Sequence, residues 1–491
     1  MTTLTRDPGA PPGPARQRLT AIEELDYLLD RVWEPNLVLW ELHAHGHLDR
    51  DLLADALTAA FGSDSGARRR LAAAGRWGRR LYWRQAPAPG PYAPAAGDSG
   101  SRLLTVASWR TPDELEALRQ RLFAWPIALN QAVVRVILAV GPDHDAMIMQ
   151  VHHTAFDGVS SLRLLSALTR AYRDRAPSAR PRPSVPAPRP APTPSKNTAA
   201  PSTPESSETS PKTDFALDRP GTAFPADRPG PALVTRAQTR SWPGTVTRIA
   251  PQAGQPGRPG YGFVLTTEAV TRPASRGDGP RPTVNDLLVA ALCLAIDRWN
   301  AAHDRPSGQI SVTIPVNGRL AGQRWQGDGN LSWLMRVVTG PARRAVPDRL
   351  LASVAFQTRA ARERGRTGTD ALSRLLATAW APVPVKRRAA RLIRGLAAPV
   401  LSDTSLVSNL GVLPEPPTFD GSGTEPLWLA PPCPMPRGLA IGAVSAGGRL
   451  YLSVRYRLAL MDQAAAEDFA ACFRAAIAEL ARPGSAAAEA P

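Results

Sequence analysis

Two adjacent histidines followed by an Asp-Gly pair form the segment of this chain that is best suited to chemistry. The segment reads His152-His153-Thr-Ala-Phe-Asp157-Gly158. A short apolar run at 145–151 has strand character, and residues 159–172 repeat apolar side chains at helical spacing. The motif is therefore expected to lie at the turn between a buried strand and an amphipathic helix. A histidine at a rigid strand end can act as a general base near neutral pH.

The two histidines are expected to have different roles, because neighbouring residues on a strand face opposite sides. We expect His153 to be the base that removes a proton from an attacking hydroxyl or amine, and to return it to the leaving group. His152 is expected to pack or to orient its neighbour. Asp157 is the second candidate catalytic residue, since a carboxylate close to a histidine invites comparison with a triad. Gly158 is expected to let the backbone turn tightly into the helix.

Composition narrows the possible partners. The net charge of +17 comes from 59 Lys and Arg against 42 Asp and Glu. The arginines are spread along the chain without a known nucleic-acid-binding signature, so nucleic acid is not an expected partner. A basic surface would instead suit coenzyme A phosphates, an acyl carrier protein or anionic lipid. Cys293, Cys433 and Cys472 lie far apart, which favours a reducing cytoplasm. No run of about 18 apolar residues or secretory signal is visible.

A group of histidines and a basic segment each have two interpretations. His43, His45 and His47 alternate as ligands on one strand face would, but Gly46 and Leu48-Asp49 indicate that the strand ends there, so we expect no metal site. The stretch 386–394 predicts a basic amphipathic helix that could contact an anionic membrane or an acidic carrier protein. A solvated face of an arginine-rich protein is the favoured interpretation, with at most peripheral membrane contact.

Changes in composition divide the chain into five parts. Residues 1–18 and 483–491 are expected to be disordered. Residues 19–175 contain the histidine motif and capping boxes at Thr20–Glu23 and Thr111–Glu114. Residues 176–232, rich in Pro, Ser, Thr and Ala, predict a disordered linker. Residues 233–482 form a second ordered part. Strands and helices alternate in both ordered parts, which predicts layered α/β subdomains.

The spacing HHxxxDG resembles the signature of the condensation-domain and chloramphenicol-acetyltransferase-like acyltransferase superfamily. Other stretches resemble members of this superfamily in the same order. Leu19–Asp26 resembles its first helix, Thr283-Val-Asn-Asp286 the "ND" segment of wax ester synthase/diacylglycerol acyltransferases, and Ile314–Arg319 the Pro-x-x-x-Arg strand end. Ser408-Asn-Leu-Gly411 and the stretches 436–442 and 448–456 resemble the C-terminal part of wax ester synthases, polyketide-associated acyltransferases and free-standing condensation proteins.

The resemblance implies a fold and an activity. The fold would be α/β, with two chloramphenicol-acetyltransferase-like layered subdomains in a V and an active-site tunnel between them. The activity would be acyl transfer to an alcohol from a coenzyme A or phosphopantetheinyl carrier-protein thioester. It would need no tightly bound cofactor and, without a GxSxG motif, no acyl-enzyme. Amide formation by a free-standing condensation enzyme is the close alternative. A non-catalytic module that docks a carrier protein is the other. A cytoplasmic monomer is expected.

The resemblance also assigns supporting roles. Asp157 would be mainly structural and would bridge to Arg319. Attack on a thioester creates an oxyanion that needs a hydrogen-bond donor, and Ser408 and Asn409 are candidates. These two residues could instead only shape a strand crossover between the subdomains.

Overall fold

The computed structural model describes residues 16–30, 35–64, 66–75, 77–86, 104–176, 246–252, 260–270, 273, 281–319, 322, 324, 325, 327, 329–364, 378–401 and 403–482. The predicted linker, apart from residue 176, and the predicted disordered tail at 483–491 lie outside the described residues. So do residues 1–15. Residues 16–18 differ from the expectation of disorder, because they form strand β1 (Arg16–Arg18), which pairs with β4 (Tyr82–Gln85).

A five-stranded sheet carries the histidine motif. Its strand order is β12-β2-β7-β6-β5, and every neighbouring pair is antiparallel except β5 and β6. The strands are β2 (Leu37–His43), β5 (Leu104–Ser108), β6 (Val134–Val140), β7 (Ala146–His152) and β12 (Leu427–Ala430). The apolar run at 145–151, which predicts a strand, corresponds to β7.

The two faces of this sheet are covered by different parts of the chain. Helices α2 (Arg50–Ser63) and α4 (Gly158–Arg175) pack on the face that holds Trp40 and Met149. Helix α3 (Pro112–Ala124) packs on the opposite face, together with apolar side chains of β8 (Tyr261–Ala269). Both faces of the central strands are therefore buried, which explains their nearly continuous apolar sequences.

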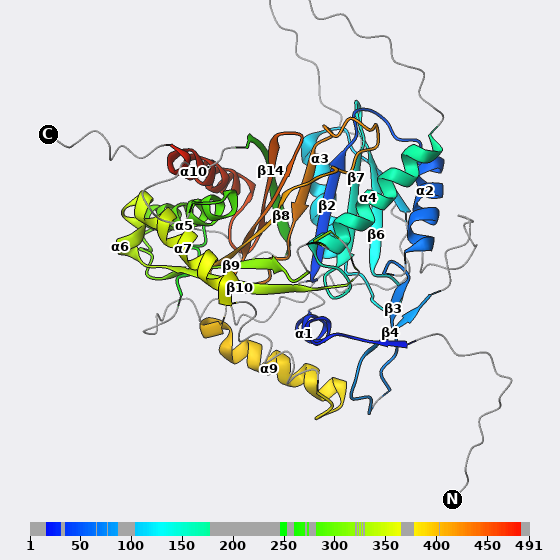
Figure 1. Ribbon diagram of the computed structural model, residues 1–491, viewed down its shortest axis with the longest axis horizontal. Coiled ribbons are helices and arrows are strands. Elements are labelled where there is room, and N and C mark those ends of the chain that lie inside the picture. Colours follow the sequence, from blue (N-terminus) through cyan, green and yellow to red (C-terminus); the bar gives the residue numbers. More distant parts are fainter. Residues whose placement is uncertain are drawn as a thin grey trace, which may run out of the picture. The chain divides into compact units, whose positions relative to one another are not determined.

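The second large sheet has six strands. Its order is β10-β9-β11-β13-β14-β8, and β11 runs parallel to both of its neighbours. The remaining strands are β9 (Ile310–Asn317), β10 (Ser332–Thr339), β11 (Ser405–Val412), β13 (Leu439–Ala446) and β14 (Arg449–Arg457). Helices α5 (Val284–Ala302), α7 (Pro347–Arg364) and α10 (Gln463–Ala481) contribute to its core, as Figure 1 shows beside the sheet.

Strand β12 departs from the predicted division into sequential subdomains. It lies within the predicted second subdomain, residues 233–482, but it pairs with β2 at the edge of the first sheet. Covering this edge removes a row of unpaired backbone groups. Arg455 of β14 joins the two parts as well: it is fully buried, donates to the Leu37 carbonyl oxygen at 3.0 Å and stacks on the Phe123 ring.

The predicted capping box of Thr20 and Glu23 is present at α1 (Ala21–Leu29). The predicted box at α3 is only half formed: the Thr111 hydroxyl accepts from the Glu114 N–H, but the Glu114 carboxylate accepts from the Arg110 N–H and not from that of Thr111. Helix α9 (Val383–Leu401) packs against α1 beneath the sheets in the view of Figure 1. Within the described part of the chain, no helix is long and apolar enough to cross a membrane.

Candidate functional site

The histidine motif lies where the sequence predicts, between β7 and α4. His152 is the last residue of β7, and the backbone N–H of His153 donates to the Asn36 carbonyl oxygen at 2.8 Å. The side chain of His153 is 22% exposed and lines a cavity of about 900 Å³. The strand end therefore fixes the backbone while the imidazole stays accessible from the cavity.

His152 faces away from the cavity, as the alternation along a strand predicts. Its side chain is buried, and its Nδ1 accepts from the Thr154 N–H at 3.3 Å. Its Nε2 lies 3.4 Å from an Oδ atom of Asp30. His152 is not among the residues that line the cavity. These contacts tie the turn to the C-terminal end of α1.

Two residues that the sequence reasoning missed hold the Nδ1 side of His153. Asp26 Oδ2 lies 3.7 Å from His153 Nδ1, and the Asn330 amide nitrogen lies 3.1 Å from the same atom. The Asn330 amide also donates to Asp26 Oδ2 at 2.7 Å and to the His153 carbonyl oxygen at 3.2 Å. Its Oδ1 accepts from the Ser332 N–H, which fixes the orientation of the amide. All three side chains line the cavity.

Helix α1 presents one carboxylate to each histidine. Asp26 and Asp30 are four residues apart, so they lie on the same side of the helix. Asp26 faces His153 and Asp30 faces His152. The signal in the sequence was this i, i+4 spacing within the segment that resembles the superfamily's first helix, but no pattern in the sequence linked that helix to the histidines.

The electrostatic environment of Asp26 is unusual for a carboxyl group. Burial raises the pKa of Asp26 to about 6, an effect that the neighbouring His153 and His152 and the Asn330 amide partly oppose. Burial disfavours the charged form of an acid, and a nearby cation favours it. The Asp26 carboxyl therefore changes charge in the same pH range as histidine side chains.

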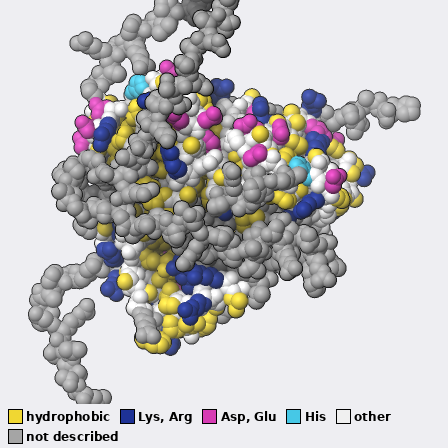
Figure 2. Space-filling model, turned by 180° about the vertical axis from the view of Figure 1, so that it is seen from behind, with side chains coloured by type: hydrophobic (Ala, Val, Ile, Leu, Met, Phe, Trp, Pro, Cys, Tyr) yellow, Lys and Arg dark blue, Asp and Glu magenta, His cyan; other side chains and the backbone are white. Residues whose placement is uncertain are grey.

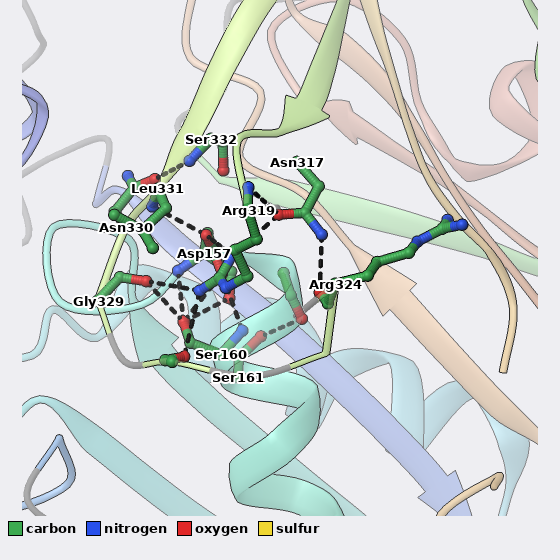
Figure 3. A network of polar contacts seen from close by, with 12 residues as sticks. Asp157, Ser160, Ser161, Asn317, Arg319, Arg324, Gly329, Asn330, Leu331 and Ser332 are labelled. Atoms are coloured by element: carbon green, nitrogen blue, oxygen red, sulfur yellow. Dashed lines mark hydrogen bonds and ion pairs between the residues drawn. The ribbon is translucent and has the colours of Figure 1, made fainter. Parts of the chain in front are cut away.

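Asp157 forms the expected ion pair with Arg319, and both side chains are 2% exposed. Arg319 Nη1 donates to Asp157 Oδ2 at 2.6 Å, and the Leu331 N–H donates to the same oxygen at 2.9 Å. Asp157 Oδ1 accepts from the Ser160 N–H, so it caps α4. Figure 3 shows these contacts converging on Asp157.

This network engages both carboxylate oxygens of Asp157 with Ser160, Arg319 and Leu331. Among the described residues, no hydrogen bond joins its carboxylate to either histidine. Arg319 also donates to the carbonyl oxygens of Gly327 and Gly329, and the Ser160 hydroxyl donates to the Gly329 carbonyl oxygen (Figure 3). The network therefore fastens the segment before β10, which carries Asn330, to the start of α4.

Gly158 lies close to a residue of β11. It is the first residue of α4 and is not among the glycines with positive φ. A Cβ atom at this position would lie 3.0 Å from Leu410 Cδ2. The absence of a side chain thus lets β11 pass close to the N-terminus of α4.

Ser408 and Asn409 line the cavity from β11, next to an irregularity in its pairing with β13. The register shifts between Asn409 and Val412, and Gly411 has a φ of 78°. Asn409 Oδ1 accepts from the Gly411 N–H at 2.8 Å. Bulges of this kind re-aim side chains at the edge of sites. Both residues are therefore placed where a polar group of a bound molecule could meet them.

The cavity wall combines polar groups with a large apolar area. The apolar part comes from helix α1, from strands of both sheets and from the segment after β12, and it includes Ile22, Leu25, Val38, Ile314, Met335 and Met435. A concave, mostly apolar wall with a few convergent polar groups is typical of small-molecule sites. The predicted residues His153, Asp157, Gly158, Arg319, Ser408 and Asn409 all line this cavity, and His152 does not.

The histidines at 43, 45 and 47 do not share one ligand site. Strand β2 ends at His43, and the three side chains contact three different carboxylates: Glu41, Asp420 and Asp145. Within the described residues, His45, Asp420 and Glu425 bring ligand atoms within 4.8 Å of one another, so they could hold a cation. These residues lie at the opposite end of β2 from the cavity, about 20 Å away for a strand of this length.

The cysteines carry no sign of a reactive group. Cys293 and Cys433 are buried and Cys472 is half-buried. Burial raises the pKa of the Cys293 thiol to about 11, so it remains protonated at neutral pH.

Comparison with known proteins places this geometry in a known fold. No protein-family model matches the chain. Two uncharacterised proteins of Mycobacterium tuberculosis, MT2362 and Rv2305, are 29% identical over 466 residues, which cover 93% of this chain and 98% of each relative.

Three solved structures illustrate the similarity of fold. They are the first condensation domain of the CDA synthetase (TM-score 0.54, 15% identity, 95% of this chain and 96% of that chain), the wax ester synthase/diacylglycerol acyltransferase from Marinobacter aquaeolei VT8 (0.54, 15%, 94% and 98%), and the starter condensation domain of rhizomide synthetase, solved with C8-CoA and Leu-SNAC (0.54, 13%, 95% and 95%). The chain therefore has the mixed α/β fold of these condensation domains and of the wax ester synthase/diacylglycerol acyltransferase.

Proposed function

We propose that this protein is an acyltransferase that moves an acyl group from a thioester to an acceptor, with His153 as general base. The observation that carries the proposal is the state of the His153 ring. Its Nδ1 is held by Asp26 and Asn330, while the ring borders a large cavity. A base must be fixed in orientation and still reach the proton that it abstracts.

One arrangement of protons is compatible with these contacts and leaves Nε2 free to act as the base. The amide nitrogen of Asn330 has two hydrogens, and Asp26 Oδ2 and the His153 carbonyl oxygen accept them. His153 Nδ1 can then carry its own proton on the side of Asp26, which leaves the lone pair of the neutral ring on Nε2. In this tautomer, Nε2 accepts the proton from an acceptor hydroxyl or amine in the cavity.

The reaction then proceeds in one ternary complex. As His153 Nε2 takes the proton, the acceptor oxygen or nitrogen bonds to the thioester carbonyl carbon. The resulting oxyanion collapses, the carbon–sulfur bond breaks, and the thiolate recovers the proton from Nε2. Ser408 and Asn409 are the proposed oxyanion donors, because both line the cavity beside the bulge in β11. No side chain carries the acyl group.

Asp26 is the proposed positioning partner of the base. When His153 accepts the proton, it becomes a cation 3.7 Å from the Asp26 carboxylate. At pH 7 the Asp26 carboxyl is mainly ionised, since its raised pKa of about 6 still lies below that pH. Its negative charge then offsets the positive charge that develops on the imidazole in the transition state.

The donor is proposed to be an acyl-coenzyme A or a phosphopantetheinyl carrier-protein thioester, bound without a resident cofactor. Arg324 and Arg362 are exposed and line the cavity, so they can meet donor phosphates. The apolar wall suits an acyl chain. Ester formation on an alcohol is the preferred reaction, and amide formation on an amine is the alternative with the same proton path. The open cavity beside His153 disfavours a module that only docks a carrier protein.

The test is product analysis by mass spectrometry with a panel of acyl-coenzyme A donors and of alcohol and amine acceptors. We expect an ester product that depends on His153. In parallel, the enzyme is incubated with acyl thioester alone, and its intact mass is measured after denaturation. We expect no acyl adduct; a stoichiometric adduct that chases into product would overturn the direct mechanism.

A further inference from the structure

We propose that α9 and the neighbouring loop around Trp77 form a docking face for an anionic lipid bilayer. The docking face comprises Trp77, Arg79, Arg80, Trp380, Val385, Arg388, Arg391 and Leu392, all of which are exposed. The proposal concerns where the protein works and does not depend on the catalytic role of His153.

Helix α9 has two clearly different sides. Val383, Lys386 and Ala390 recur at i, i+3 and i+7, and all three are buried. Lys386 forms a fully buried ion pair with Glu24 of α1, and Ala390 packs on Leu28. Val385, Arg388 and Leu392 follow the same spacing on the other side and are exposed. Packing against α1 thus fixes which side of α9 faces outward.

The exposed apolar side chains are of the kinds found at membrane interfaces. Leu392 is 64% exposed, Trp77 is 74% exposed and Trp380 is 50% exposed. The Val383 N–H donates to the Gly78 carbonyl oxygen at 2.8 Å, which holds the loop of Trp77 beside the start of α9. Tryptophan is enriched where an apolar ring and its N–H can sit between lipid chains and water.

The charge around these side chains has one sign. Arg79, Arg80, Arg388 and Arg391 are exposed, and the segments 66–86 and 378–401 contain no Asp or Glu. Figure 2 shows blue and yellow side chains together at the lower end of the molecule, where Figure 1 places α9. Cations mixed with large apolar side chains on one helix side are the arrangement that binds in the plane of an anionic membrane surface.

The docking face adjoins the candidate site. Ala390 of α9 and Leu25 of α1 both line the cavity, so the helix that would contact lipid also forms part of the cavity wall. Docking would bring the cavity close to the bilayer. Under the proposed acyltransferase function, a lipid-dissolved acceptor or a long acyl chain could then enter without crossing water.

The experiment is sedimentation of the full chain with vesicles of phosphatidylcholine, alone or mixed with phosphatidylglycerol, at low and high NaCl concentration. We expect binding to the mixed vesicles only, weakened by salt. Arg388→Gln with Arg391→Gln should weaken binding about 30-fold, because each cation near an anionic surface contributes substantially and independently. Trp77→Ser with Trp380→Ser should reduce binding at both salt concentrations, because it removes apolar contact with lipid.

The matched control changes the same residue types elsewhere. Phe356→Ser with Arg349→Gln alters an aromatic residue that is 65% exposed and an exposed arginine, both on α7, and should bind vesicles like the wild type. Thermal unfolding confirms that each variant is folded. The proposal is wrong if the wild type binds neutral vesicles equally well, binds neither kind, or loses binding as much in the control as in the docking-face variants. Binding only to an acidic carrier protein would also overturn it.

Discussion

Six of the seven histidines of this protein lie at the two ends of one five-stranded sheet, and the two ends behave differently. His152 and His153 end β7 beside the cavity. His43, His45, His47 and His144 lie at the opposite end of β2 and β7, beyond which the chain turns. Each end pairs histidines with carboxylates, so composition and pairing alone do not separate them.

At the far end, the histidine His43 is held by contacts on both sides of its ring. His43 Nε2 contacts Glu41 at 2.6 Å, and His43 Nδ1 contacts His144 Nε2 at 3.2 Å. Glu41 is buried, and the Arg119 guanidinium holds the pKa of that carboxyl well below its usual range. Burial and the neighbouring His43 lower the pKa of His144. None of these four histidines is among the residues that line the cavity.

The comparison teaches that a free ring nitrogen at a cavity, and not the presence of histidine and carboxylate, marks the candidate site. His43 has both ring nitrogens engaged. The contacts of His153 in the described part of the chain all involve Nδ1 or the backbone. Five predictions test this difference.

The largest effect is expected from His153→Ala, which should lower the rate of acyl transfer by about 10²–10⁴-fold by removing the general base. His45→Ala at the far end is the matched control and should leave the rate unchanged. Turnover numbers with the identified substrates, together with thermal unfolding of both variants, measure the contrast. Near-wild-type turnover in His153→Ala would refute the base assignment.

Asp157→Ala should lower the free energy of unfolding by roughly 3–5 kcal/mol, because it leaves the buried Arg319 guanidinium unpaired. Asp145→Ala is the comparison at the far end. Asp145 is also buried, but its partner His47 has a side chain that is 56% exposed and can be solvated. Loss of the Asp145 carboxylate should lower the free energy of unfolding by about 1–3 kcal/mol, mainly because the backbone N–H groups that donate to it are left without an acceptor. Equal losses in urea unfolding would contradict the proposed importance of the Arg319 pair.

Asp26→Asn should lower kcat by about 10–100-fold while changing KM little, because the charge that offsets the imidazolium is lost. The pH profile separates this role from a merely structural one. The pKa of Asp26 is raised to about 6, so its carboxylate is lost as the pH falls through that value. The acid limb of the wild-type profile should therefore reflect two groups, and that of Asp26→Asn one. An unchanged profile shape would argue against the pairing.

The same substitution should affect stability in the opposite direction. Because the pKa of Asp26 is higher in the folded than in the unfolded protein, its ionisation is less favourable in the folded state. The free energy of unfolding therefore falls as the pH rises from about 4 to 6. Asp26→Asn removes this cost. The variant should be more stable than the wild type at pH 7, by about 1–3 kcal/mol, and the difference should shrink near pH 4. Asp30→Asn, which alters the partner of His152, is the matched control for activity.

The smallest effect is expected from His45→Gln. His45 and Asp420 form an exposed pair with side chains that are 42% and 33% exposed, and such pairs contribute about 0–1 kcal/mol. Thermal unfolding should change accordingly. Adding Zn²⁺ should raise the melting temperature of the wild type no more than that of the variant. A rise in the wild type alone would identify His45, Asp420 and Glu425 as a metal site.

The sequence by itself determined the local features of this protein. Apolar periodicity located the strand at 145–151 and the helix at 159–172, the threonine caps located helix starts, and HHxxxDG located the strand-to-helix turn that presents His153. These are properties of neighbours along the chain, for which hydrogen bonding and side-chain spacing act over a few residues. The pairing of Asp157 with Arg319, far apart in sequence, was predicted only through the resemblance to known acyltransferases.

Only the tertiary structure decided which distant groups meet at the site. Asp26 and Asn330 reach His153 because α1 and the segment before β10 pack against the end of β7 from parts of the chain separated by hundreds of residues. Strand β12 pairs with β2 and covers the edge of the first sheet, and no local pattern in the sequence encodes this pairing. Only the packing shows that a Cβ atom at Gly158 would lie 3.0 Å from Leu410 Cδ2. Such contacts depend on how packed layers fit together, and that fit is set by the whole chain.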